Sequence, residues 1–67
     1  MAWKKKMVYT ITAWIANYEE SGYAYPSETF YRETLEEAEA LKARLLEDPE
    51  YEDVWISDEK EEREFWD

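Results

Sequence analysis

The sequence contains no cysteine and no histidine, and it has only one glycine and two prolines among its 67 residues. Without cysteine the chain has neither disulfide bonds nor thiolate ligands for zinc. Without histidine it lacks the commonest metal ligand and the usual general base at neutral pH. A single glycine cannot build a phosphate-binding loop or a nucleophile elbow, because each of these motifs requires more than one.

Long hydrophobic runs are missing as well, since no stretch approaches the ~18 apolar residues of a membrane span. These absences predict a protein that is not an enzyme, binds no cofactor or metal ion and does not enter a membrane. The lack of cysteine also fits a cytoplasmic location.

The sequence is instead rich in negative charge, with 18 acidic and eight basic residues and a net charge of −10. Residues 1–46 hold seven acids and six bases, whereas residues 47–67 hold eleven acids and two bases, a net charge of −9. Such a field repels nucleic acid and membrane surfaces and attracts basic proteins. The acidic third is therefore interpreted either as a recognition surface or as a solvated region that keeps the protein soluble.

One helix is predicted over residues 34–47. The hydroxyl of Thr34 can cap its first turn, and Glu37 can reach back to the Thr34 amide. The helix should end near Asp48, because Pro49 follows and disfavours helical geometry in the residue before it. Apolar residues lie on one arc of about 140° at roughly 100° per residue, which predicts that the helix covers a sheet. These residues are Leu35, Ala38, Leu41, Leu45 and Leu46.

The strongest strand is predicted over residues 7–18, which are rich in β-branched and aromatic side chains. Successive side chains of a strand alternate between its two faces. The face expected to lie under the helix consists of Met7, Tyr9, Ile11, Ala13 and Ile15. The opposite face consists of Val8, Thr10, Thr12, Trp14, Ala16 and Tyr18.

A tight reversal is predicted at residues 19–22, where the chain has its only glycine, and a second strand follows over residues 23–32. Pairing these two strands across the reversal places Ile11 opposite Phe30. Both side chains then lie in the core, and the second strand forms an edge of the sheet.

One residue conflicts with this register, because Glu28 falls opposite Ala13 on the core side. Pro26 cannot donate a hydrogen bond to a neighbouring strand. A bulge at Pro26 would relieve the conflict by rotating Glu28 outward.

A third strand is predicted over residues 51–57, with Val54 and Ile56 facing inward. The most apolar strand should lie in the middle, which gives a single α+β domain over residues 1–67. Its three-stranded antiparallel sheet has the order 2-1-3, the element order is ββαβ, and one helix packs on one face. Residues 58–67 are expected to form either a short helix or a disordered acidic tail.

The uncovered face of this sheet is predicted to carry six aromatic residues and to make contacts. They are Trp14, Tyr18, Tyr23, Tyr25, Tyr31 and Trp55. Three uses are considered: cover by a second copy or by Phe65 and Trp66 of the same chain, docking of another protein, and stacking on nucleic acid bases. The net charge argues against the third, because phosphate attraction supplies most of the affinity for nucleic acids.

Acidic residues around the third strand and the tail complete the predicted partner-binding surface. They are Glu50, Glu52, Asp53, Asp58, Glu59, Glu61 and Glu62. Carboxylates spaced along a strand and a tail can imitate the phosphates of duplex DNA, which follow one another every ~1.7 Å when both strands are counted.

In its size, its acidity and its missing catalytic residues, the whole chain resembles the small phage and mobile-element inhibitors of the anti-CRISPR or anti-restriction type. The resemblance is one of composition, and no sequence motif carries it. It implies a protein partner with a basic surface, such as a nuclease, and no direct binding of nucleic acid. The alternative is a homodimeric accessory domain whose acidic face serves solubility.

Overall fold

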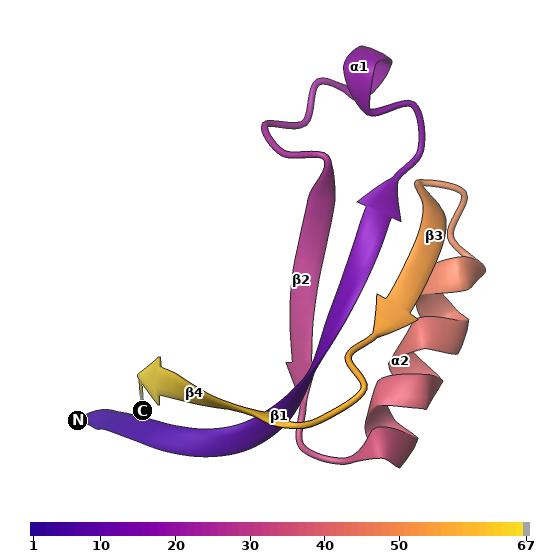
Figure 1. Ribbon diagram of the computed structural model, residues 1–67. Coiled ribbons are helices and arrows are strands. Elements are labelled where there is room, and N and C mark those ends of the chain that lie inside the picture. The colour runs from indigo at the N-terminus through magenta and orange to yellow at the C-terminus, as the bar shows by residue number, and fades with distance from the viewer. Residues whose placement is uncertain (67) are drawn as a thin grey trace.

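The computed structural model describes residues 1–66 and shows the predicted α+β class, with a main helix and an antiparallel sheet (Figure 1). The sheet has four strands rather than the three predicted from the sequence. The elements in chain order are β1 (Trp3–Ile15), α1 (Tyr18–Ser21), β2 (Ser27–Arg32), α2 (Leu35–Leu46), β3 (Tyr51–Ile56) and β4 (Glu61–Trp66).

The C-terminal half of β1 lies between β2 and β3, and both neighbours run antiparallel to it. The predicted order 2-1-3 is therefore confirmed for these three strands. The predicted register is confirmed as well, since Ile11 pairs with Phe30 across β1 and β2. On the other side of β1, Ala13 pairs with Val54 of β3.

Helix α2 covers one face of this sheet with Ala38, Leu41 and Leu45 of the predicted apolar arc (Figure 1). The two end residues of that arc, Leu35 and Leu46, were wrongly predicted to face the sheet, since they are 46% and 49% exposed. The buried cluster beneath it consists of Ile11, Ala13, Ala38 and Val54. The helix begins as expected, because the Thr34 hydroxyl accepts a hydrogen bond of 3.1 Å from the Glu37 amide. Burial of this apolar face supplies the main stabilisation, since the chain contains no disulfide.

The connection between β1 and β2 differs from the predicted tight reversal. Strand β1 ends at Ile15 because Asn17 adopts the left-handed conformation, with φ of 53°, and starts the helical turn α1. Gly22 ends that turn with φ of 83°, which a residue without a Cβ adopts at little cost. The predicted strand 7–18 thus begins too late and ends too late, since β1 spans residues 3–15, and the predicted strand 23–32 begins too early. An eleven-residue connection, 16–26, separates β1 from β2.

Glu28 remains on the core side, opposite Ala13, and no bulge rotates it outward. The neighbouring pairs across β1 and β2 continue in regular register up to Ser27. The hydroxyl of Tyr51 donates a hydrogen bond of 2.6 Å to the Glu28 carboxylate. The conflict seen in the sequence is therefore resolved by a hydrogen bond rather than by backbone geometry.

Residues 58–66, the described part of the predicted helix or tail 58–67, form neither of the two expected structures. Residues 61–66 are strand β4, which pairs antiparallel with the N-terminal half of β1 from Trp3–Trp66 to Val8–Glu61, while Asp67 lies outside the described residues. The pairing places one acidic residue of β4 opposite a basic residue of β1, in the pair Lys5–Glu64, whereas Lys6 lies opposite Arg63. We call β4 and residues 3–8 of β1 the ribbon.

Strand β1 curves between its two halves, so the ribbon runs away from the three-stranded sheet instead of extending it (Figure 1). The curvature reverses the predicted burial of two neighbouring residues. Met7, predicted to face the core, is 52% exposed, whereas Val8, predicted to face outward, is 2% exposed. Val8 lies with Tyr31 of β2 and Phe65 of β4 around one shallow depression, which Glu37 of α2 also lines.

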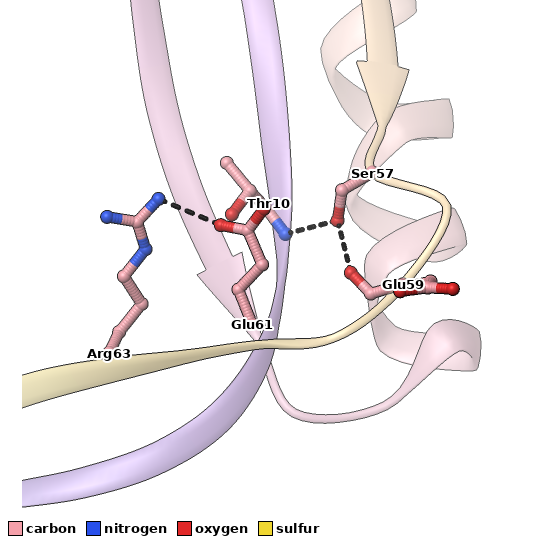
Figure 2. Close-up of polar contacts among 5 residues, drawn as sticks. All are labelled: Thr10, Ser57, Glu59, Glu61 and Arg63. Carbon is pink, nitrogen blue, oxygen red and sulfur yellow. Dashed lines mark hydrogen bonds and ion pairs between the residues drawn. The ribbon is translucent and has the colours of Figure 1, made fainter.

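Polar contacts join β1 at Thr10 to the connection between β3 and β4 (Figure 2). The backbone amide of Thr10 donates a hydrogen bond of 3.1 Å to the Ser57 hydroxyl, which donates one of 3.0 Å to the Glu59 carbonyl. Arg63 also forms an ion pair of 3.0 Å with Glu61 on β4. These contacts hold the chain where it passes from β3 to β4.

Candidate functional site: an acidic end with exposed aromatic residues

The sheet face that α2 does not cover carries a pair of tryptophans near the end of β1. The rings of Trp14 and Trp55 lie 5.6 Å apart between centroids, with planes inclined at 35°. Trp55 is 43% exposed, and Trp14 is half-buried. The buried Nε1 of Trp14 has no hydrogen-bond partner within residues 1–66, nor does the buried Oγ1 of Thr10 on the same face.

The other end of this face is covered by the ribbon. The ring of Phe65 packs edge-on against Tyr31, with centroids 5.6 Å apart, and the Arg63 guanidinium lies 5.7 Å from the same Tyr31 ring. Phe65 thus folds back over the sheet face that α2 does not cover, which is one of the arrangements predicted from the sequence. Trp66 instead packs against Trp3, 5.3 Å away on the ribbon.

Tyr23 and Tyr25 do not lie on the sheet face, contrary to the sequence prediction. Both belong to the connection between β1 and β2, where Tyr25 is 74% exposed. The hydroxyl of Tyr23 donates a hydrogen bond of 2.9 Å to the carboxylate of Glu50, just before β3. The aromatic set predicted for one face is therefore divided among the sheet, the connection and the contact with the ribbon.

Acidic residues gather at the end of the molecule to which both tyrosines belong. The backbone amide of Ala16 donates a hydrogen bond of 2.7 Å to the Glu50 carbonyl and joins segment 16–27 to segment 47–53. Together these two segments contain seven acidic residues and no basic residue. We call them the acidic end, and its acids are Glu19, Glu20, Glu47, Asp48, Glu50, Glu52 and Asp53.

Hydrogen bonds to carboxylates, with smaller contributions from burial and nearby charge, raise the pKa of two tyrosines in this region. The pKa of the Tyr51 hydroxyl is raised well above its usual value, first by its hydrogen bond to Glu28, then by partial burial and by nearby carboxylates that include Asp48 and Glu50. The pKa of Tyr23 is raised chiefly by its hydrogen bond to Glu50. Both shifts disfavour tyrosinate, as expected where negative charges accumulate without cations.

The acidic residues predicted to bind a partner are not all in one place. Glu50, Glu52 and Asp53 belong to the acidic end, whereas Glu61 and Glu62 lie on β4 opposite Val8 and Met7. Asp58 and Glu59 precede β4 in the connection from β3. The ribbon as a whole has four basic and three acidic residues, a net charge of +1, so its β4 acids are balanced by the basic half of β1.

The other four acids of the acidic end were not among the predicted partner-binding residues. Glu19 and Glu20 were expected in a turn, and Glu47 and Asp48 were counted in the acidic third, where the helix ends. A signal was present, because neither segment 16–27 nor segment 47–53 contains a basic residue. What the sequence does not reveal is that the two segments meet.

A groove of about 350 Å³ opens at the acidic end beside the tryptophan pair. Its apolar lining includes Trp14, Tyr18 and Pro26, and its acidic lining consists of Glu19, Glu20 and Glu52. A second depression, of about 250 Å³, lies beside the ribbon and has lining residues of both charges. Lys6 and Glu33 of that lining already form an ion pair of 3.4 Å, so the second depression does not select a ligand by charge.

Comparison of the chain with protein-family models, with curated proteins and with solved structures finds no match. Within residues 1–66, no group of three or more acidic side chains is placed to hold a metal ion. No helix in the same range is long and apolar enough to cross a membrane.

Proposed function

We propose that this protein is a protein-binding module whose acidic end engages a basic surface of a partner protein. The observation that carries the proposal is the acidic end itself, with seven acids, no base and exposed aromatic side chains beside them. Charge of one sign steers an oppositely charged partner and speeds association. Exposed tryptophan and tyrosine supply the apolar contacts that dominate the affinity of many interfaces.

The partner class that we favour is a protein that handles nucleic acids, such as a nuclease. Such a protein presents a basic surface shaped for phosphate groups, and carboxylates can occupy the positions of those phosphates. The protein would then act as an inhibitor of the anti-restriction or anti-CRISPR type, since it would compete with nucleic acid for the same surface.

Affinity capture from a host lysate, at low and at high salt, tests this function. The wild-type protein should retain a basic partner at low salt and lose it at high salt, because the screening length falls from ~10 Å at 0.1 M to ~3 Å at 1 M. Added duplex DNA should release the partner if it binds the same basic surface.

Two variants with equal loss of charge identify the surface responsible. The first changes three acids of the acidic end that lie outside the groove lining, as Glu47→Gln, Glu50→Gln and Asp53→Asn. The second changes three acids of β4, as Glu61→Gln, Glu62→Gln and Glu64→Gln. We expect the first variant to associate with the captured partner several-fold more slowly and the second to behave like the wild type. Equal retention by all three proteins would contradict the proposal.

A further inference from the structure

The groove at the acidic end combines an apolar wall with a carboxylate rim. Trp14 lies at the end of β1, Tyr18 opens the turn α1, and Pro26 immediately precedes β2. The carboxylates come from α1 and from β3, so the rim draws on two separate segments of the chain. They are Glu19, Glu20 and Glu52.

Contacts within the fold hold the aromatic side chains of the wall in place. Trp14 packs against Trp55, and the hydroxyl of Tyr18 donates a hydrogen bond of 3.2 Å to the Ala24 carbonyl across the connection. A wall held in this way loses little conformational entropy when a ligand binds, which favours binding.

The charge of the lining defines the kind of ligand. Aromatic faces attract cations through the ring quadrupole, and carboxylates accept hydrogen bonds from them. The protein uses this chemistry elsewhere with its own cations, since Lys60 Nζ lies 5.7 Å from the Tyr9 ring centroid and Arg63 lies at the same distance from that of Tyr31. Segments 16–27 and 47–53 contain neither lysine nor arginine. The groove therefore offers aromatic and acidic groups, and these two segments supply no cation to occupy it.

We propose that this groove binds an arginine side chain of a basic protein partner, with the guanidinium stacked on the aromatic wall and donating hydrogen bonds to the carboxylate rim. This inference rests on the proposed function and names the group that the acidic end recognises. Arginine fits better than lysine, because the planar guanidinium stacks on aromatic rings and donates two parallel hydrogen bonds to a carboxylate, whereas the ammonium group is a strongly hydrated point charge. A volume of about 350 Å³ is enough for one long side chain with part of its backbone.

The unused donor of Trp14 supports a ligand carried on a polypeptide. Its buried Nε1 has no hydrogen-bond partner within residues 1–66, and a buried donor without an acceptor is unfavourable. A peptide brings backbone carbonyl groups together with its arginine side chain. Trp14 lines the groove, so such a carbonyl is the kind of acceptor that its indole lacks.

Two peptides of equal length and charge, hexa-arginine and hexa-lysine, test the inference on the full chain. The affinity of each is measured by titration calorimetry at low salt. Both should bind through the field of the acidic end, and hexa-arginine should bind at least about threefold more tightly because of stacking and paired hydrogen bonds.

Variants then locate the preference. The groove variant changes the rim, as Glu19→Gln, Glu20→Gln and Glu52→Gln, and should reduce the affinity ratio of the two peptides towards one. The control variant removes three exposed charges elsewhere, as Glu39→Gln, Glu59→Gln and Glu64→Gln, and should weaken both peptides equally while keeping the ratio. All six positions are exposed, so both variants should keep the fold, which circular dichroism verifies. In a separate variant, Tyr18→Ala, the ratio should also fall.

The outcomes separate the two proposals. If neither peptide binds the wild-type protein at low salt, the proposed function and this inference both fail. If both peptides bind with the same affinity, the acidic end still attracts basic partners, but the arginine site is overturned. A preference for arginine that survives unchanged in the groove variant also overturns the site, because the preference then arises elsewhere.

Discussion

The curvature of β1 predicts that alanine substitution costs much more stability at Val8 than at the neighbouring Met7. Val8 is 2% exposed and lies with Phe65 of the ribbon and Tyr31 of β2 around one depression, whereas Met7 is 52% exposed. Val8→Ala removes two buried methyl groups, which corresponds to about 1.5 kcal/mol of transfer free energy at ~0.8 kcal/mol each. The cavity left behind adds to this loss, so we expect the free energy of unfolding to fall by about 2 kcal/mol.

A loss of this size is a large part of the total stability, which is about 3–5 kcal/mol for a domain this small. Met7→Ala should change the free energy of unfolding by less than about 0.5 kcal/mol, as is usual for exposed positions. Urea unfolding followed by tryptophan fluorescence measures both variants. With a slope of ~1 kcal/mol per M, the midpoint of Val8→Ala should fall by about 2 M and that of Met7→Ala should hardly move. A larger shift for Met7→Ala than for Val8→Ala would refute the described curvature of β1, since an uncurved strand buries Met7 instead.

Three further substitutions test individual contacts by the same urea assay. Tyr51→Phe removes the hydrogen bond to the half-buried Glu28 and should cost about 1 kcal/mol. Because folding raises the pKa of Tyr51, its contribution should be fully present below pH ~10, and the difference between wild type and Tyr51→Phe should shrink as the pH rises further; a difference that grows above pH 10 would contradict this. Thr34→Ala removes the cap bonded to the Glu37 amide and should cost about 1 kcal/mol, so an unchanged midpoint would argue against the capping bond. Gly22→Ala should cost about 1 kcal/mol through backbone strain alone, because its φ is 83° and a Cβ there would meet no atom within 4 Å; full stability would mean that the turn relaxes.

The central sheet was predictable because its signals are local and agree with one another. The alternation along β1, the capped apolar helix and the inward pair Val54 and Ile56 all require the same buried face. The register of β1 and β2 followed from keeping Phe30 opposite Ile11, since a slip by one residue would expose the core. The register was therefore predicted correctly even though the connection 16–26 is longer than the predicted reversal.

The ribbon was not predictable, because its strand β4 is charged and matches the composition of a solvated tail. The partner that makes it a strand lies at the other end of the sequence, where Lys5 pairs with Glu64 and Trp3 with Trp66. Strand curvature likewise depends on tertiary packing, so the alternation that correctly places Ile11 fails at Met7 and Val8. The acidic end was not predicted as one surface because it depends on a tertiary contact. It forms only when the connection after β1 meets the start of β3.

The ribbon also has a consequence for how the molecule folds and opens. Its paired residues lie between 53 positions apart, for Val8 and Glu61, and 63 positions apart, for Trp3 and Trp66. Closing so long a loop is slow, and a two-stranded ribbon is only marginally stable alone. The strands of the ribbon should therefore pair last during folding and separate first during local unfolding. Hydrogen exchange at its amides should therefore be faster than at those of Ile11 and Ala13. Each opening withdraws Phe65 from Tyr31 and so exposes the Tyr31 ring to solvent and to partners.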